Sequence, residues 1–264
     1  MEGIILAVVS ITIIGSLCAL ILSLASSLMS VKKADDFTDR LLEVLPAINC
    51  GVCGFSGCPA YAAALAEGSG TKHNLCVPGG DEVMRQLSAI LGLQEETIAG
   101  KTAIIHCGGP LKERREKMFY QGIGSCFAAR SILGGKSACS YGCLGFGDCL
   151  RVCPANAICL EDGLAYIDPR YCTGCSLCLK ACPAKIISLE ESSNKTYIAC
   201  SNLERGAEGR KKCDRCCLGC GRCVRECPQK AVVIEDNLAK IIYTACTDCG
   251  HCSTICPASC IRSY

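Results

Sequence analysis

The sequence lacks the features by which most catalytic and nucleotide-binding proteins are recognised. It has no tryptophan, few aromatic residues and three histidines, which are not spaced as a zinc or catalytic pair. No Ser–His–Asp arrangement, P-loop or paired acid and base is visible, and Gly122 and Gly124 supply only the first two glycines of a dinucleotide fingerprint. We therefore expect no catalytic side chains of the usual kinds and no nucleic-acid partner.

A large charge imbalance is also absent. The formal net charge is +2 and half of the residues are apolar, which excludes a disordered chain. What the sequence has instead is sulfur, because 28 of its 264 residues are cysteine. That density is typical of disulfide frameworks, metal sites or inorganic clusters.

The first part of the chain is a long uncharged run. Residues 4–29 carry no charged side chain, and at 1.5 Å per residue such a helix is about 39 Å long, enough to cross roughly 30 Å of hydrocarbon. A cleavable signal peptide would have a shorter apolar core after a basic segment, whereas only Glu2 precedes this run and Lys32 and Lys33 follow it. The run predicts a single-pass membrane anchor with residues 32–264 on the cytoplasmic side, where thiols stay reduced.

The cysteines repeat at a fixed interval. When the chain is shifted by 74 residues, nine cysteines superpose without a gap, and Pro154 and Pro183 meet Pro228 and Pro257. The chain therefore carries one module twice. In each copy two short apolar stretches flank Asp-Gly or Asp-Asn, which predicts a β-hairpin at 157–167 and another at 231–243.

Three segments have the complete spacing of bacterial ferredoxins, Cys-x2-Cys-x2-Cys-x3-Cys-Pro, beginning at Cys172, Cys217 and Cys246. In this spacing three thiolates hold one cubane and the fourth cysteine is a ligand of the paired cluster. The fourth segment departs from the pattern, because Phe146 stands where the middle ligand belongs. Cys139 is the nearest cysteine that could replace it.

A further site precedes the modules, with the spacing Cys-x2-Cys-x4-Cys-x17-Cys in a glycine-rich loop. We therefore expect five 4Fe–4S clusters, with Cys213 as a competitor of Cys220. Zinc is the alternative, above all at the first site, where four cysteines fit it by number. The expected ligand groups are Cys50, Cys53, Cys58 and Cys76; Cys139, Cys143, Cys149 and Cys182; Cys153, Cys172, Cys175 and Cys178; Cys217, Cys220, Cys223 and Cys256; and Cys227, Cys246, Cys249 and Cys252.

Cys126 and Cys200 coincide in the repeat but have no assigned ligand role; we expect them to be small buried residues or to lie near a cluster. Two charged segments are also ambiguous. Residues 112–117 mix charge signs at helical spacing, which predicts a solvated helix face or a docking patch. The basic group at 210–212, with Arg215, is a candidate for steering an acidic redox partner.

The uncharged run, the first cysteine site and the ferredoxin-type pairs together resemble the B-type subunit of the Rnf complexes. The resemblance covers almost the whole chain and is most specific at residues 49–59, 76–80 and 141–149. It implies an electron-transfer subunit of a membrane-bound, ion-translocating ferredoxin:NAD oxidoreductase, an enzyme only as part of that translocase. It also implies soluble ferredoxin as the electron donor, other subunits as partners, and neither flavin nor ion path in this chain.

The expected fold is α+β: a single N-terminal transmembrane helix in contact with the lipid bilayer, a small 4Fe–4S domain, and two tandem ferredoxin-like modules with two clusters each. Two other functions stay open, namely an electron-relay hub of another redox complex (hydrogenase, formate or corrinoid system) and a zinc-stabilised scaffold. The expected parts are an anchor at 1–31, the 4Fe–4S domain at 32–92, a connector at 93–135, module 1 at 136–190, a linker at 191–209 and module 2 at 210–264.

Overall fold

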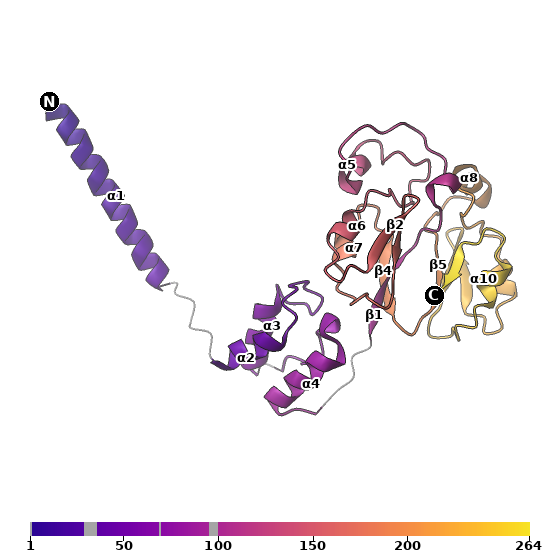
Figure 1. The fold of residues 1–264 in the computed structure, drawn as a ribbon, viewed down its shortest axis with the longest axis horizontal. Helices are drawn as coiled ribbons and strands as arrows, with labels where there is room; N and C mark the ends of the chain where they lie inside the picture. The colour runs from indigo at the N-terminus through magenta and orange to yellow at the C-terminus, as the bar shows by residue number, and fades with distance from the viewer. Residues whose placement is uncertain (1, 29–35, 69, 95–99) are drawn as a thin grey trace.

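The computed structural model describes residues 2–28, 36–68, 70–94 and 100–264. The first helix, α1 (Glu2–Leu28), stands apart from the remainder of the chain (Figure 1). Within these described ranges, no helix meets the length and apolarity needed to cross a membrane. The membrane anchor stays a prediction, and the lysines expected to flank it, Lys32 and Lys33, lie outside the described residues.

The N-terminal helical part packs around Leu41, Tyr61 and Leu87, which are almost completely buried. A helix begins at Cys58, because Pro59 suits the first turn of a helix. This places a predicted cluster ligand directly at the helix start. The elements are α2 (Asp36–Val44), α3 (Cys58–Ala66), the 3-10 turn η1 (Val77–Gly79) and α4 (Gly80–Leu91).

The first module, residues 101–191, contains two antiparallel strand pairs, β2–β3 and β1–β4. Strand β1 lies in the segment 93–135 that was expected to be a connector, and it pairs along its whole length with β4. The ferredoxin-like unit therefore begins before the first repeated cysteine. Its elements are β1 (Lys101–Ile105), η2 (Leu111–Glu113), α5 (Cys126–Ser131), α6 (Asp148–Arg151), β2 (Ile158–Glu161), β3 (Leu164–Ile167), α7 (Leu177–Ala181) and β4 (Ile187–Glu191).

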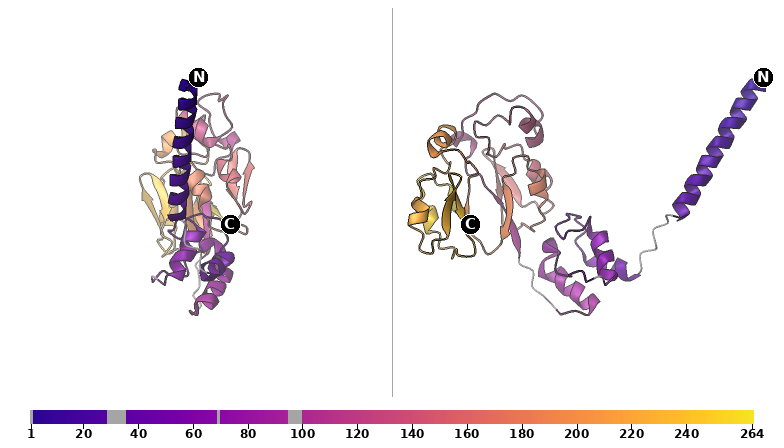
Figure 2. Two further views of the ribbon diagram at one scale, coloured as in Figure 1. Left: turned by 90° about the vertical axis from the view of Figure 1, so that its left-hand side faces the viewer. Right: turned by 180° about the vertical axis from the view of Figure 1, so that it is seen from behind.

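The second module, residues 196–263, repeats this plan beside the first (Figure 2). Its outer strand pair is β5–β8 and its hairpin is β6–β7, both antiparallel. The expected linker 191–209 likewise contributes a strand, β5. The elements are β5 (Thr196–Ile198), α8 (Gly206–Lys212), α9 (Arg222–Arg225), β6 (Val232–Glu235), β7 (Leu238–Ile241), α10 (His251–Ile255) and β8 (Ile261–Ser263).

Both predicted hairpins are confirmed, and their turns explain the register. Asp162 and Gly163 have φ of 46° and 64°, and Asp236 and Asn237 have φ of 49° and 63°. Two consecutive residues with positive φ form the tight turn that matches the twist of two antiparallel strands. The turn fixes Glu161 opposite Leu164, so Leu164 points into the module and is fully buried.

The charged segment 112–117 is not the solvated helix face that its spacing predicts. Only the single turn η2 forms there, and Arg114 is 8% exposed, with its guanidinium donating hydrogen bonds to the carbonyl oxygens of Cys143 and Gly163. The neighbouring residues tie the two modules together. Arg115 pairs with Asp214 at 2.6 Å, and Arg215 donates to the carboxylate of Glu113 at 3.0 Å.

Candidate iron–sulfur cluster sites

The four ferredoxin-type loops share one local design. In each, the third cysteine is the second residue of a helix of four or five residues: Cys149, Cys178, Cys223 and Cys252. The residue before each helix has a left-handed backbone, and it is glycine in three loops and Ser176 in the fourth. A left-handed residue reverses the chain sharply, which returns the earlier cysteines of the loop toward the third.

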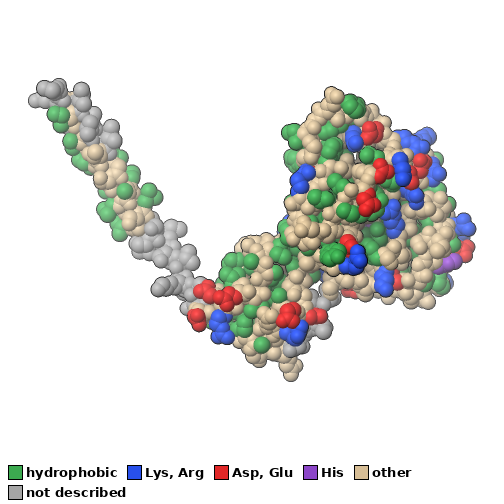
Figure 3. Space-filling model, in the orientation of Figure 1, with side chains coloured by type: hydrophobic (Ala, Val, Ile, Leu, Met, Phe, Trp, Pro, Cys, Tyr) green, Lys and Arg blue, Asp and Glu red, His purple; other side chains and the backbone are tan. Residues whose placement is uncertain are grey.

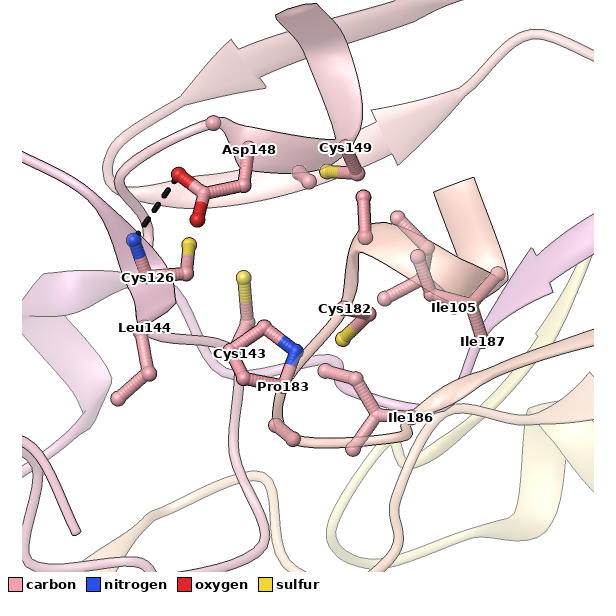
Figure 4. A pocket seen from close by; sticks show the side chains of 14 residues that line it. Ile105, Cys126, Cys143, Leu144, Asp148, Cys149, Cys182, Pro183, Ile186 and Ile187 are labelled. Carbon is pink, nitrogen blue, oxygen red and sulfur yellow. Dashed lines mark hydrogen bonds between the residues drawn. The ribbon is translucent and has the colours of Figure 1, made fainter. Parts of the chain in front are cut away.

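The cavity around Cys182, about 390 Å³, is lined by four cysteines of the first module (Figure 4). Burial, and to a smaller extent four neighbouring thiols, raise the pKa of the Cys149 thiol to about 12. We name this the Cys182 cavity. Its cysteines are Cys126, Cys143, Cys149 and Cys182.

The structure therefore puts Cys126, and not the expected Cys139, beside Cys143 and Cys149. Cys126 comes from the first turn of α5, in the segment between β1 and the repeated loops. Asp148 fixes it there by accepting a hydrogen bond from the N–H of Cys126 at 2.9 Å (Figure 4) and another from the N–H of Phe127 at 3.0 Å. The hydroxyl of Ser125 also donates to Asp148, at 2.9 Å.

The corresponding cavity in the second module, about 330 Å³, is the Cys256 cavity. It is lined by Cys217, Cys220, Cys223 and Cys256, the predicted group, together with Cys260. The Cys260 thiol lies 3.6 Å from the sulfur of Cys256. Hydrogen bonding with Cys260 lowers the pKa of Cys256 and that of Cys217, which favours the thiolate form of these sulfurs.

The two swapped groups also come together as their spacing predicts. A cavity of about 360 Å³, the Cys252 cavity, is lined by Cys227, Cys246, Cys249 and Cys252. In the first module, burial raises the pKa of Cys178 to about 12, with smaller contributions from the nearby thiols of Cys172, Cys175 and Cys153.

The four N-terminal cysteines lie together beside the first module. Burial, with smaller contributions from the thiols of Cys58, Cys50 and Cys53, raises the pKa of the Cys76 thiol to about 11. The ammonium group of Lys180, on α7, donates a hydrogen bond to the carbonyl oxygen of Cys50 at 2.6 Å. The loop of the first site is thus fastened to the helix that follows Cys175 and contains Cys178.

These groups fit iron–sulfur clusters in the chemistry of their donors. Each offers four thiols, and backbone N–H groups point at the sulfurs, as in the bonds from Ala103 to Cys172 (3.4 Å), Ala231 to Cys227 (3.3 Å) and Asp248 to Cys246 (3.4 Å). In the part of the chain that the structure describes, no three ligating side chains converge on the position of one metal ion. The ferredoxin-type thiols instead surround cavities.

Cys139 and Cys213 line a fourth cavity, of about 310 Å³, which we name the junction cavity because residues of both modules form it. Cys213 is therefore not placed with Cys217 and Cys223, where Cys220 lies. The other cysteines of the junction cavity are Cys107, Cys200 and Cys216.

Sequence reasoning missed Cys107, Asp148 and Arg114. One signal for Cys107 was present, because the strand ends Ile105-His-Cys107 and Ile198-Ala-Cys200 match at a separation of 93 residues. The ungapped shift of 74 hid this match by pairing Cys126 with Cys200. Asp148 had no signal beyond its position inside a cysteine loop, and Arg114 had none beyond its place in the charged segment 112–117.

Comparison with known proteins agrees with this geometry. A family model for an Fe-S cluster domain matches residues 45–78. Two models described as 4Fe-4S dicluster domains match residues 171–231 and 216–261.

Among similar curated proteins is the B-type subunit of a proton-translocating ferredoxin:NAD(+) oxidoreductase complex from Clostridium ljungdahlii, 37% identical over all of this chain and 93% of its own length. The B-type subunit of an ion-translocating oxidoreductase complex from Methanosarcina acetivorans is 32% identical, with 94% of both chains covered. Its counterpart in the Na(+)-translocating ferredoxin:NAD(+) oxidoreductase complex of Acetobacterium woodii is 35% identical over 82% of this chain and 65% of its own.

Asp148 offers a test of the Cys182 cavity. Burial opposes its ionisation, but the hydrogen bonds from Cys126, Phe127 and Ser125, with Arg151, outweigh burial and lower its pKa. We expect Asp148→Ala to cost about 1–3 kcal/mol of stability near pH 7, because buried donors lose their acceptor. A carboxylate whose pKa is lowered in the folded state stabilises the protein above the ordinary carboxyl pKa near 4, and this stabilisation is lost as the pH falls through the folded-state pKa. The loss of stability in Asp148→Ala should therefore become smaller only in acid.

Anaerobic thermal unfolding of both proteins across this pH range measures the deficit. Asp168→Ala is the matched control, because it removes a carboxylate whose partner, Arg170, is exposed; its melting should match the wild type. Equal melting of Asp148→Ala and the wild type at pH 7 would show that Asp148 does not hold Cys126 in place.

Proposed function

The chain belongs to the family of B-type subunits of Rnf-type ion-translocating ferredoxin:NAD(+) oxidoreductase complexes, and on this basis we propose that it is the electron-transfer subunit of such a complex. It accepts electrons from reduced ferredoxin and relays them through bound 4Fe–4S clusters toward the other subunits. Its residues hold and tune the redox groups, and they supply no acid, base or nucleophile. Its part in the enzyme is therefore that of one component among several.

The observation that supports this proposal most directly is the exchange of cysteines within each module. Cys182 ends one loop but lies on the cavity of Cys143 and Cys149, while Cys153 lies beside Cys178. The exchange holds the two sites of a module next to each other. When bound, 4Fe–4S clusters supply one-electron chemistry, so adjacent sites suit a relay.

We propose five clusters at these sites. The assignment keeps the groups that the spacing predicts, with Cys126 in place of Cys139 in the first module. The ligand groups are Cys50, Cys53, Cys58 and Cys76; Cys126, Cys143, Cys149 and Cys182; Cys153, Cys172, Cys175 and Cys178; Cys217, Cys220, Cys223 and Cys256; and Cys227, Cys246, Cys249 and Cys252.

The surroundings of the thiolates would tune the sites differently. In the Cys256 cavity the Cys260 thiol lies 3.6 Å from the sulfur of Cys256 and can donate its single proton to it, which stabilises negative charge there. Lys180 holds the N-terminal site against the first module through the carbonyl oxygen of Cys50. We propose that this contact is the route between the N-terminal site and the modules.

The electron donor that we propose is a soluble, acidic ferredoxin. Such a protein would be attracted electrostatically to a basic surface of this chain. Lys and Arg side chains gather over the region of α8 in the second module (Figure 3). Lys211, on this helix, is 70% exposed although it pairs with Glu208. An electron-relay hub of another redox complex would use the same clusters, and the choice of donor separates the two functions.

We also propose that residues 4–29 anchor the chain in the lipid bilayer as a single pass, with residues 32–264 in the cytoplasm. The support is the uncharged run and the lysines that follow it in the sequence. We divide the chain into this anchor, the N-terminal 4Fe–4S domain of 32–92 and two ferredoxin-like modules. Flavin and ion path belong to other subunits of the complex.

The ligand assignment predicts the iron content of a cysteine variant. Cys126→Ala should lower the iron by about four atoms per chain in anaerobically purified protein, because one 4Fe–4S site loses a ligand. Cys159→Ala is the matched control, since Cys159 is exposed on β2 and lines none of the four cavities, and its iron content should be unchanged. Unchanged iron in Cys126→Ala would remove Cys126 from the ligand group.

The proposed donor predicts a difference between two reductants. Reduced ferredoxin should bleach the visible absorption of the purified chain under anaerobic conditions, whereas NADH alone should not, because this chain holds no flavin. Bleaching by NADH, or none by ferredoxin, would contradict the proposal and favour another redox partner.

Lysine variants refine this test in stopped-flow mixing. Lys211→Glu should slow reduction by ferredoxin several-fold at low salt and much less at high salt. Lys240→Glu is matched, because Lys240 also pairs with a glutamate and is 49% exposed, but on the β6–β7 hairpin. Equal effects of both variants would argue against docking at α8.

The anchor predicts where the chain is found when it is produced without other subunits. The full chain should remain with membranes after alkaline carbonate extraction, and a chain lacking residues 1–31 should be released. Release of the full chain would contradict the anchor.

A further inference from the structure

The junction cavity holds the largest group of cysteines that the five proposed sites do not use. Strands β1 and β5 end beside it, and His106 joins them by a 2.8 Å contact between its Nδ1 and the carbonyl oxygen of Ile198. The guanidinium of Arg262 donates to the carbonyl oxygen of Gly108 at 2.9 Å. The cavity therefore lies where the two modules are firmly joined.

Its sulfurs come in pairs that the two modules contribute in the same way. The N–H of Cys143 donates to the sulfur of Cys107 at 3.4 Å, and the N–H of Cys217 donates to the sulfur of Cys200 at 3.3 Å. Cys143 and Cys217 are equivalent in the 74-residue repeat. Cys107 and Cys200 are thus structural counterparts, each placed behind the first cysteine of a cluster loop.

The second pair is Cys139 and Cys213, which are also equivalent in the repeat. Each accepts a backbone N–H from two residues further on, Tyr141 and Arg215. Cys143 and Cys217, in the proposed cluster sites, accept N–H groups from Gly145 and Gly219 in the same manner. Burial, with a smaller contribution from the thiols of Cys107 and Cys139, raises the pKa of Cys213 to about 11, and the three sulfur-bearing residues line the same cavity.

Two buried donors on the cavity have no acceptor among the described residues. They are Nε of Arg114 and Nδ2 of Asn202, whose residues are 8% and 1% exposed. Leaving a buried donor unpaired is costly, and a buried guanidinium also needs a negative partner. Four thiolates around an iron–sulfur core provide both negative charge and sulfur acceptors.

We propose that Cys107, Cys139, Cys200 and Cys213 hold a sixth 4Fe–4S cluster, shared equally by the two modules. The proposal rests on the proposed function, because it extends the same relay. Cys216 also lines the cavity, but its sulfur lies 3.1 Å from the position of a Cβ on Gly209, against α8, and Cys216 has no counterpart in the repeat, where Gly142 stands. The shared site connects the Cys182 cavity to the Cys256 cavity through Cys143 and Cys217.

Iron and acid-labile sulfide counted in the anaerobically purified full chain test this site. Six clusters predict roughly 24 iron atoms per chain, and five predict roughly 20. A wild-type value near 20 overturns the sixth site but leaves the proposed function standing, whereas a value far below 20 overturns the proposed function itself. This comparison needs no variant and so does not depend on folding of a mutant.

Variants identify the ligands. Cys107→Ala and Cys200→Ala should each lower the iron by about four atoms, while Cys216→Ala, the control from the same cavity, should keep the wild-type content. Electron paramagnetic resonance of the reduced protein should lose the signal of one cluster in the first two variants. Loss of iron in Cys216→Ala with full iron in Cys200→Ala would overturn this ligand group.

Discussion

The bonds between cysteine sulfur and an inorganic core are the interaction on which the rest of this structure depends. Each module has two short strand pairs and helices of one or two turns, which enclose little apolar volume. Its buried residues include cysteines such as Cys149 and Cys223, set among a few aliphatic side chains. The cavities that these cysteines line occupy the position of a hydrophobic core, so we expect folding and cluster binding to be coupled.

The same arrangement explains how the chain can conduct electrons. Because the last cysteine of each loop lies with the paired group, the two groups of thiols inside a module are held next to each other. Between modules, the Arg115–Asp214 pair joins the segments that follow η2 and α8, and the contact of His106 with Ile198 joins the ends of β1 and β5. Lys180 joins the N-terminal loop to the first module. These contacts hold the N-terminal group of thiols beside the first module and the first module beside the second.

Much of this was predictable from the sequence, since cluster ligation fixes cysteine spacing and tight turns fix residue type. The hairpins at Asp162-Gly163 and Asp236-Asn237 and the exchange of Cys153 and Cys182 followed from these rules. The cysteine that joins Cys143 and Cys149, where Phe146 stands at the middle ligand position, could not be predicted. Cys126 comes from a segment that the second module lacks, and only the fold brings it to Asp148. Because the first module has this additional segment, the structural counterpart of Cys200 is Cys107 and not Cys126. An alignment of the two repeats without a gap cannot show this. The sequence predicted that Arg114 would be one of several exposed charges in the segment 112–117. Its burial in the structure shows that it is part of the module junction.

The central claim is that the thiol groups hold cubane clusters and not single metal ions. Mössbauer spectroscopy of the full chain, produced with iron-57 and kept anaerobic, tests it most directly. The account predicts that nearly all iron gives the quadrupole doublets of oxidised 4Fe–4S cores, with equal amounts of sulfide and iron. A spectrum of isolated tetrahedral iron, or protein that carries zinc without sulfide, would contradict it.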